Sequence, residues 1–315
     1  MRLLPVLGID LPIIQAPIGS AASPALAAAV ANAGGLGTLS ISWSTEARIR
    51  RMIRATRALT QRPFAVNLVL EWPQEERLKV ALDEGVRIIS TFCGNPSASI
   101  QAVHEAGGLL MHTIGSLDDA AAAVAAGVDI IVIQGVEAGG HVCTDIPLMR
   151  LIRQIRAAFP DAPLVAAGGL ADAADVTAVL DAGADAAWLG TRFVCSAEAN
   201  AADLYQQKII EAHADDTVMT TVFSLGWPDS PHRVIRNSTV RMAAGAPADR
   251  GAGSTPDIVA HSRRGTPIER YAFGIPTRGM TGDLEAMALY AGCSVEKIHD
   301  VRPAADLVRS LSGVG

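Results

Sequence analysis

The residue best suited to acid–base chemistry is His141, which ends the segment QGVEAGGH (Gln134–His141). It is the one histidine in a glycine-rich stretch, and an imidazole with an ordinary pKa of about 6.5 suits a general base at neutral pH. Gly139 and Gly140 would let the loop fold tightly over a ligand and leave the imidazole uncovered. The residues alone leave two interpretations open: a catalytic base, or a histidine in an ordinary surface loop.

Two glycine-containing segments could hold an anion. Gly168-Gly169 and Gly190-Thr191 each follow a short apolar run, and backbone without a side chain can bring its N–H groups close to a phosphate. Thr191 adds a hydroxyl donor. Ordinary turns use glycine in the same way, so a pair of simple turns is the alternative.

Asn67 and Gln134 are amides at the ends of two further apolar runs. Each can donate and accept hydrogen bonds, as the alternating N–H and C=O groups along the edge of an isoalloxazine ring require. The alternative is that they bond only to neighbouring loops. His112 lies inside an apolar run, and we expect it in the core or behind the site.

The cysteines form no recognisable metal or disulfide motif. They are Cys93, Cys143, Cys195 and Cys293. Their wide spacing without a CxxC pair argues against a zinc finger or a disulfide framework and fits a reducing cytoplasm. His141, Cys143 and Asp145 stand at alternate positions, but a metal needs three or four convergent ligands, so we expect no metal site.

Composition excludes several classes of protein. Half of the 315 residues are hydrophobic and 18% are charged, so the chain can bury a large core. The net charge is −6 and no basic tract is present, so nucleic acid is not an expected partner. The apolar N-terminal run is broken by Pro5, Gly8, Asp10 and Pro12, which is untypical of a signal peptide. No apolar stretch is long enough for a membrane span.

An internal repeat indicates the elements that must position these residues. Alanine-rich helical segments end at Gly34, Gly85, Gly107, Gly127 and Gly183 and run into short apolar segments. Such runs are typical of strands buried on both faces of a parallel sheet. The expected strands are Ile13–Ala16, Leu36–Ser40, Phe64–Leu68, Arg87–Thr91, Leu109–Thr113, Ile130–Gln134, Leu164–Ala167 and Ala186–Leu189. Helices are expected between them, for example over Pro24–Ala33, Leu117–Ala126 and Ala171–Ala182.

Eight such units predict an α/β fold, a (β/α)8 TIM barrel. A doubly wound open sheet is the alternative, but the first strand ends in QAPIGS and lacks the GxGxxG of a dinucleotide-binding turn. In a TIM barrel the carboxyl ends of the strands form the active site. The candidate residues Asn67, Gln134, His141, Gly168, Gly169, Gly190 and Thr191 all lie at or just after such ends, and His112 stands next to the end of the fifth strand.

The repeat stops at about residue 200. We expect residues 1–200 to form the barrel, residues 201–281 to form a cap or lid over its mouth, and residues 282–315 to form C-terminal helices that pack back on the barrel. The expected helices of this last part lie near Leu284–Tyr290 and Ala304–Leu311.

Taken together, these motifs resemble those of the nitronate monooxygenases, formerly called 2-nitropropane dioxygenases. The resemblance covers nearly the whole chain, and the segment that ends at His141 is its most specific part. The matching segments are PIIQAPIG (Pro12–Gly19), AVANAGGLGTLS (Ala29–Ser40), RPFAVNL (Arg62–Leu68), QGVEAGGH (Gln134–His141), AAGGLAD (Ala166–Asp172), LGTRF (Leu189–Phe193) and LYAGCSV (Leu289–Val295).

The resemblance implies a non-covalently bound FMN and a catalytic His141. Carried over by position, Asn67, Gln134 and Gly139 would contact the flavin, with Gln15 and Ala16 beside them at the end of the first strand. The phosphate of FMN would bind to Gly168, Gly169, Gly190 and Thr191.

The implied reaction is oxidative denitrification. A nitronate, or a nitroalkane deprotonated by His141, would react with O2 to give a carbonyl compound and nitrite without NADH. An NAD(P)H-dependent FMN reductase acting on quinones or enoyl thioesters is the alternative, and a flavin-binding module without turnover is a third. Two departures from the family pattern could alter the pocket mouth: Cys293 stands where glutamine is expected, and Val142-Cys143 follows His141 where Arg-Gly is expected.

Overall fold

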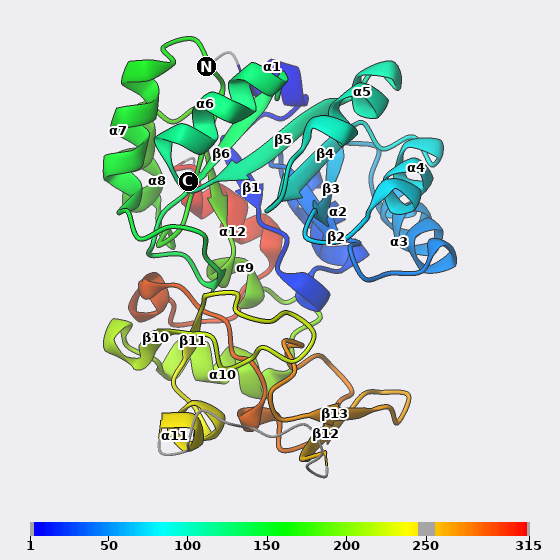
Figure 1. Ribbon diagram of the computed structural model, residues 1–315, viewed down its shortest axis with the longest axis vertical. Helices are drawn as coiled ribbons and strands as arrows, with labels where there is room; N and C mark the ends of the chain where they lie inside the picture. Colours follow the sequence, from blue (N-terminus) through cyan, green and yellow to red (C-terminus); the bar gives the residue numbers. More distant parts are fainter. Residues whose placement is uncertain (1–2, 245–255, 314–315) are drawn as a thin grey trace.

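The computed structural model describes residues 3–244 and 256–313, which form a closed parallel barrel and a cap at one end of it (Figure 1). The eight strands of the barrel follow the order β1-β9-β8-β6-β5-β4-β3-β2. Backbone hydrogen bonds between Gln15 and Leu36 and between Leu36 and Ile13, both 2.9 Å, join β1 to the segment before β2 and close the ring. The strands are β1 (Ile13–Gln15), β2 (Gly37–Ser40), β3 (Phe64–Val69), β4 (Ile88–Phe92), β5 (Leu109–Ile114), β6 (Ile130–Gln134), β8 (Leu164–Ala167) and β9 (Ala186–Leu189).

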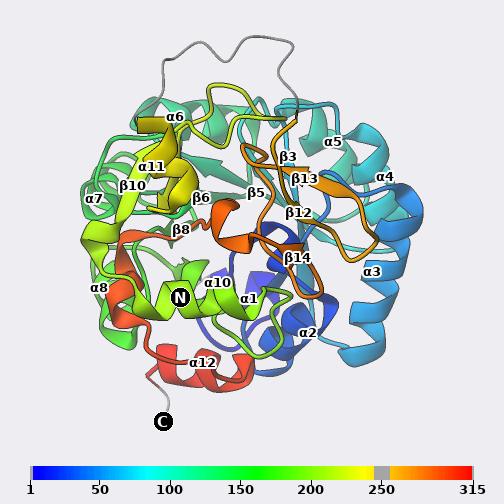
Figure 2. The ribbon, with the colours of Figure 1, turned by 90° about the horizontal axis from the view of Figure 1, so that it is seen from below.

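Helices surround the barrel, and Figure 2 shows them as an outer ring seen along its axis. They are α2 (Pro24–Asn32), α3 (Glu46–Leu59), α4 (Glu75–Asp83), α5 (Ser97–Glu105), α6 (Leu117–Ala126), α7 (Leu148–Ala158) and α8 (Ala173–Asp181), with the short α9 (Thr191–Val194) after β9. The prediction of a (β/α)8 barrel is therefore confirmed, and each expected strand agrees with the observed one to within one residue at either end.

Glycine and side-chain caps explain where these elements begin and end. The five glycines of the repeat all have positive φ angles, for example +89° at Gly127 after α6, a conformation that costs other L-residues energy. Helix α8 begins two residues later than expected. Asp172 accepts a hydrogen bond from Asp175 N at 2.8 Å and caps the helix, while the Asp175 carboxylate accepts from the N–H groups of Ala171 and Asp172.

Apolar side chains fill the space inside the barrel and the layer between strands and helices. The interior cluster includes Ile14, Met111 and Val165 from the strands, and the N-terminal helix α1 (Leu3–Leu7) packs Leu3 and Leu7 on it. Each such burial contributes about 1.5–3 kcal/mol to stability. The interior is therefore a packed core, and the polar site must lie at one end. In the described part of the chain, no helix combines the length and the apolar character that a bilayer crossing requires.

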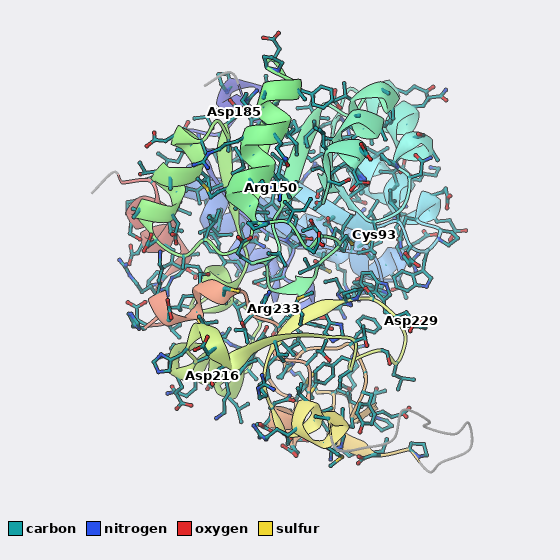
Figure 3. All side chains as sticks on the ribbon, turned by 60° about the vertical axis from the view of Figure 1, so that its left-hand side comes forward. Cys93, Arg150, Asp185, Asp216, Asp229 and Arg233 are labelled. Atoms are coloured by element: carbon teal, nitrogen blue, oxygen red, sulfur yellow. The ribbon has the colours of Figure 1, made fainter. Side chains whose placement is uncertain are left out.

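The described part of the cap has two small antiparallel sheets and two α-helices across the mouth of the barrel (Figure 2). One sheet joins the barrel loop to the cap, in the order β10-β11-β7, and the other has the order β13-β12-β14. Arg233 lies where cap and barrel meet (Figure 3) and donates to Val136 O at 2.9 Å. The elements are β7 (Gly140–His141), α10 (Asp203–Glu211), η2 (Ala214–Asp216), β10 (Thr217–Thr220), β11 (His232–Ile235), α11 (Ser238–Ala244), β12 (Ile258–His261), β13 (Pro267–Glu269) and β14 (Thr281–Gly282).

The prediction of a helix near Leu284–Tyr290 is wrong. Only one 3-10 turn forms there, η3 (Leu284–Ala286). Asn237 Nδ2 donates to the carbonyls of Glu285 and Met287, each at 2.7 Å, and Thr239 Oγ1 donates to Ala286 O at 2.6 Å. These side chains from the cap take the carbonyl groups that a continuing helix would use.

The last helix is present over the expected residues. It is α12 (Ala304–Leu311), and it packs against α2 and α8. Between η3 and α12 lies a second 3-10 segment, η4 (Cys293–Lys297), which packs against α9 and α10. Residues 281–287 thus lie with the cap sheets, whereas η4 contacts the short α9, and α12 packs on the barrel helices α2 and α8.

Candidate active site

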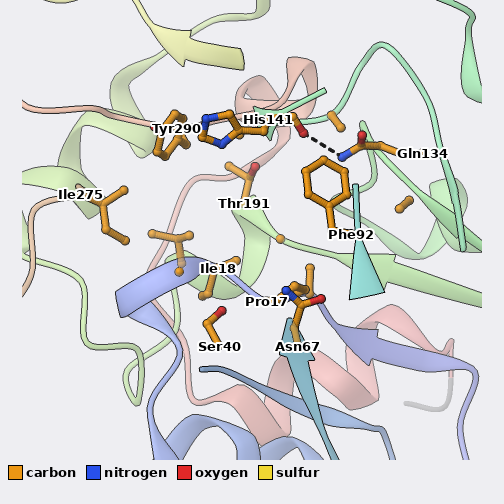
Figure 4. A pocket seen from close by; sticks show the side chains of 18 of the residues that line it. Pro17, Ile18, Ser40, Asn67, Phe92, Gln134, His141, Thr191, Ile275 and Tyr290 are labelled. Atoms are coloured by element: carbon orange, nitrogen blue, oxygen red, sulfur yellow. Dashed lines mark hydrogen bonds between the residues drawn. The ribbon is translucent and has the colours of Figure 1, made fainter. Parts of the chain in front are cut away.

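A cavity opens at the mouth of the barrel, between the carboxyl ends of the strands and the cap (Figure 4). It brings together most of the residues that the sequence indicated, from the ends of β1, β3, β6, β8 and β9 and from the segment around β7. Those that line it are Ala16, Asn67, Gln134, Gly139, His141, Gly168, Gly169, Gly190 and Thr191. Because the carboxyl ends of the barrel strands meet at one face, these side chains and backbone groups surround a single cavity.

Gln15 is not among the residues that line this cavity. Its side chain is fully buried, and its Oε1 accepts a hydrogen bond from Thr38 N at 2.9 Å. Alternate residues of a strand point to opposite faces, so its neighbour Ala16 reaches the cavity while Gln15 links β1 to β2.

The loops after β8 and β9 expose backbone that a ligand can approach. Gly168 and Gly169 have φ angles of +113° and +69°. Gly190 has ordinary backbone, and a Cβ placed there would lie 3.5 Å from Ile18 and otherwise in the cavity. Thr191 Oγ1 accepts from Gly292 N at 3.1 Å, which leaves its hydroxyl proton available for an anion.

Glycine is required at position 139 because the segment around Ala291 and Gly292 passes directly against it. A Cβ at this position would lie 2.4 Å from the backbone of both Ala291 and Gly292, closer than atoms can pack. The segment LYAGCSV therefore crosses directly over the β6 loop. Cys293 N donates to Glu137 O at 3.0 Å and fixes that crossing.

Both amides line the cavity, with Phe92 between them in the view of Figure 4. Asn67 Oδ1 accepts from Ser90 Oγ at 2.9 Å. Gln134 Nε2 donates to the backbone oxygen of His141 at 3.1 Å, which ties β6 to β7. Gln134 Oε1 is buried without a hydrogen-bond partner among the described residues, and such an atom calls for a partner supplied by a ligand or water.

His141 lies in a different setting from the uncovered loop that its glycines suggested. It belongs to β7, which pairs antiparallel with β11, His232 opposite His141. Its imidazole is stacked on the indole of Trp227, with 3.8 Å between ring centroids and 20° between planes. The expectation of an uncovered imidazole is wrong, because a cap side chain that the local sequence cannot indicate lies against it.

The electrostatics of His141 follow from this burial. Its Nε2 is buried and has no hydrogen-bond partner in the part of the chain that the structure describes. Burial, and to a smaller extent the nearby His232, lowers the pKa of the imidazole to about 3. The ring is therefore neutral at ordinary pH, and it belongs to a residue that lines the cavity.

His112 is a buried strand residue, as expected. It is 7% exposed on β5, and its Nδ1 lies 2.8 Å from Thr91 Oγ1. Burial lowers its pKa to about 4. It supports the barrel interior and does not line the cavity.

Sequence reasoning missed a cluster of aromatic side chains at the mouth. Trp43 and Trp72 come from the loops after β2 and β3, and Trp227 and Phe273 come from the cap. The positions of Trp43 and Trp72 could have been predicted, because each follows the end of a barrel strand by only a few residues. The positions of Trp227 and Phe273 could not have been predicted, since the cap sequence has no repeat from which its topology could be inferred.

Comparison with known proteins agrees with this architecture. The sequence model of the nitronate monooxygenase family matches residues 1–76 and 70–313. A nitronate monooxygenase of Paraburkholderia phytofirmans is 37% identical over 274 residues, covering 70% of this chain and 74% of that protein. A (3aS,4S,5R,7aS)-5-hydroxy-7a-methyl-1-oxo-octahydro-1H-indene-4-carboxyl-CoA dehydrogenase of Mycobacterium tuberculosis is 32% identical over 250 residues, covering 78% and 69%.

Solved structures show the same fold. The nitroalkane oxidase of Streptomyces ansochromogenes matches with a TM-score of 0.79 and 30% identity over 98% of this chain and 96% of that one. FabK of Thermotoga maritima matches with a TM-score of 0.80 and 28% identity over 98% and 94%. The chain is thus an enzyme that belongs to the nitronate monooxygenase family of TIM-barrel oxidoreductases.

Proposed function

We propose that this enzyme binds FMN and oxidises nitroalkanes or their nitronates with O2, giving a carbonyl compound and nitrite. Membership of the family implies a flavin cofactor and an oxidoreductase activity. The observation that carries the finer assignment is the position of His141, which lines the same cavity as the glycine loops after β8 and β9 and whose Nε2 has no hydrogen-bond partner among the described residues.

The residues at the mouth fit FMN. Backbone N–H groups of Gly168, Gly169 and Gly190 and the hydroxyl of Thr191 would hold the phosphate, since a side chain at Gly190 would enter the cavity. The unpartnered Oε1 of Gln134 would accept from a ring N–H, with Asn67, Gly139 and Ala16 along the same wall. A bound flavin supplies the electron acceptor and the reaction with O2.

The protein would contribute a base and a dry cavity. A nitroalkane must lose its α-proton before it can give up electrons, and the imidazole of His141, a residue that lines the cavity, would take it up. Hydrogen bonding of Gln134 to the backbone oxygen of His141 holds that segment against β6. The indole of Trp227 from the cap covers one face of the imidazole and would keep water from that side of the base.

We also propose that residues 1–200 act as the flavin-binding barrel and that the cap completes the substrate side. Trp227 and Phe273 from the cap line the same cavity as Asn67 and Gln134 from the barrel. A substrate held at the flavin would therefore touch both parts.

Comparison of a nitroalkane with its preformed nitronate tests this function. In His141→Asn, with matched FMN content, kcat/KM for the nitroalkane should fall by about 10²–10⁴-fold. The value for the nitronate, which has already lost its proton, should fall much less. Equal losses for both substrates would make His141 a binding residue, and no loss for either would remove it from the chemistry.

A reductase that oxidises NAD(P)H is the second candidate, because one relative is named a CoA-ester dehydrogenase and FabK shares the fold. Anaerobic mixing of the flavin-loaded protein with a nitronate or with NADH separates the two. Bleaching of the flavin absorbance by the nitronate alone supports the proposed function. Bleaching by NADH alone supports the reductase acting on quinones or enoyl thioesters.

A further inference from the structure

One wall of the cavity is built from aromatic rings, here called the aromatic wall: Trp43, Trp72, Phe92, Trp227 and Phe273. Their ring centroids are 5.1 Å apart for Trp72 and Trp227, 5.2 Å for Trp43 and Phe273, and 6.4 Å for Phe92 and Trp227. Three of the four tryptophans of the chain are in this cluster. Aromatic residues make up only 4% of the chain, so their concentration here is a specific feature of the mouth.

The aromatic wall offers flat apolar surface to the cavity. Trp43, Phe92, Trp227 and Phe273 line the cavity itself, while Trp72 packs behind Trp227 with a 73° angle between the rings. Trp43 is 47% exposed, although burial of an indole is favourable. An indole left half in solvent at the rim has surface available for a ligand.

The cavity contains no countercharge. None of its described lining residues is an Asp, Glu, Lys or Arg. Two charged side chains close to the lining are already engaged: Arg192 with Asp300 at 2.6 Å, and Glu137 with Leu148 N at 3.0 Å. An ionised group buried without a partner is strongly disfavoured. The substrate-facing part of the site, away from the glycine loops whose N–H groups would hold the phosphate, is thus suited to an uncharged molecule.

We propose that the substrate enters as a neutral nitro compound that carries a flat apolar group, such as an aryl ring, against the aromatic wall. This inference rests on the proposed function and specifies its substrate. The aryl group would lie against Trp43, Trp227 and Phe273, with the nitro-bearing carbon toward His141. The neutral imidazole then removes the proton inside the cavity, so that the anion forms there rather than entering from water.

The rings are too close to one another to enclose a cation. Centroid distances of 5.1–6.4 Å mean that they pack edge to face as a surface, whereas a cage for an ammonium group surrounds it on several sides. A cation would also lack a carboxylate among the described lining residues. The wall therefore favours stacking of a neutral plane.

Binding of inert probes tests the inference without turnover. Calorimetry with the flavin-loaded enzyme would compare benzamide with benzoate, which differs in charge, and with cyclohexanecarboxamide, which is neutral but not flat. We expect benzamide to bind at least about tenfold more tightly than either, since one aromatic contact is worth about tenfold in affinity. Benzoate or cyclohexanecarboxamide binding as tightly as benzamide would overturn the inference.

Variants of Trp43 supply the matched control, because this half-exposed side chain can be replaced with little risk to folding. Trp43→Phe keeps a flat ring and should retain most of the benzamide affinity. Trp43→Leu keeps an apolar side chain but no flat ring and should lose about fivefold to tenfold. Equal affinities for wild type, Trp43→Phe and Trp43→Leu would count against the aromatic wall as a binding surface.

Turnover separates this inference from the proposed function. An aryl nitroalkane such as (nitroethyl)benzene should be turned over with a kcat/KM at least about tenfold higher than that for nitroethane. Equal turnover of both, with no benzamide binding, would leave the function standing and reject the inference. If no nitro compound reduces the flavin but benzamide still binds selectively, the neutral aromatic preference stands and the nitro substrate is rejected.

Discussion

The indole of Trp227 covers one face of the His141 imidazole, with ring centroids 3.8 Å apart and planes inclined by only 20°. Trp227 comes from the cap, between β10 and β11, and is 5% exposed. The candidate base is therefore buried by a side chain that belongs to a different part of the fold. The basicity of His141 depends on where that indole lies.

Replacement of Trp227 by alanine should raise the pKa of His141. Burial is the main cause that lowers this pKa to about 3, and His232 at a centroid distance of 5.3 Å is the other. Water admitted in Trp227→Ala would stabilise the imidazolium and shift the pKa toward its ordinary value of about 6.5. The measurement is a pH titration of the histidine ring by NMR, assigned with His141→Asn.

The conservative variant Trp227→Phe provides the control for this titration. A phenyl ring keeps an apolar face on the imidazole, so the His141 pKa should stay close to the wild-type value. Tyr290, whose ring lies 5.5 Å away, is unchanged in both variants. An unshifted pKa in Trp227→Ala would mean that other neighbours bury the ring.

Acid should destabilise the barrel through His112. The pKa of this buried imidazole is about 4 in the folded protein, and about 6.5 in the unfolded chain. As pH falls from 6.5 toward 4, the unfolded chain takes up a proton that the folded protein does not, so stability is full above this window and is lost within it. The loss is at most about 1.4 kcal/mol per pH unit.

His112→Gln should remove this part of the acid sensitivity while keeping a partner for Thr91, whose Oγ1 lies 2.8 Å from His112 Nδ1. Between pH 6.5 and 4.5 the variant should lose about 2 kcal/mol less than wild type. His112→Phe should be less stable at pH 7 but show the same reduced slope. Urea unfolding at the two pH values measures all three, and an unchanged slope in both variants would exclude His112 as the source.

The barrel was predictable from sequence because its determinants are local. A strand buried on both faces, such as β3 with FAVNLV, is apolar almost throughout, and the glycines that end the helices stand next to the helices that they end. The positions of Asn67, Gln134 and Thr191 followed, since parallel strands carry their carboxyl ends to one edge.

The surroundings of these residues could not be predicted, because they arise from contacts distant in sequence. Trp227 meets His141 across 86 positions of the chain, and Asn237 captures carbonyls of the 284–287 segment that would otherwise have continued as a helix. Gly139 has a similar cause, since its lack of a side chain is required by Ala291 and Gly292. No local pattern encodes such pairings.

Gly190 offers the cleanest test of the phosphate site. Its φ angle is −104°, and an added Cβ would make only ordinary contacts with Ile18 and Ala16. Gly190→Val should therefore fold but release the flavin, because its side chain occupies the cavity where the phosphate is expected. Gly190→Ala should show an intermediate loss, which links the effect to side-chain volume. The ratio of flavin to protein absorbance after gel filtration measures retention.

Gly169 is a less selective position for the same test. Its φ angle is +69° and an added Cβ would lie 2.8 Å from Glu137 Cβ, so Gly169→Val strains the backbone as well as filling the site. Thermal unfolding of the flavin-free proteins should show a lower Tm for Gly169→Val and a near-wild-type Tm for Gly190→Val. Full flavin occupancy in both valine variants would contradict the assignment of the phosphate.

The thiols of Cys93 and Cys143 should form a disulfide when the enzyme meets hydrogen peroxide. Their Sγ atoms lie 3.5 Å apart, in the loops after β4 and β7, and a bond of about 2.05 Å needs a small further approach. Cys93 has a φ angle of +56°, an unusual conformation for a residue with a side chain, and it turns the thiol toward Cys143.

The chemistry assigns different roles to the two sulfurs. A hydrogen bond from Cys93 lowers the pKa of Cys143 while that of Cys93 is raised, so the exposed Cys143 is the better thiolate. Cys143 would attack peroxide, releasing one water and forming a sulfenic acid. Cys93 would then attack that sulfur and release a second water. Two thiols and one peroxide thus give one disulfide and two waters.

Thiol titration and peptide mapping by mass spectrometry measure the outcome. Each wild-type molecule should lose two of its four free thiols, recovered by dithiothreitol. Cys93→Ser should stop at the sulfenic acid, which dimedone traps, whereas Cys143→Ser should retain all its remaining thiols. Cys195 is fully buried and serves as the internal control.

Because Cys143 is two residues from His141, the disulfide would tie the segment carrying the base to the β4 loop. A peroxide-treated protein that keeps four thiols, or that links Cys293 instead, would show that the 3.5 Å contact is not a reactive pair.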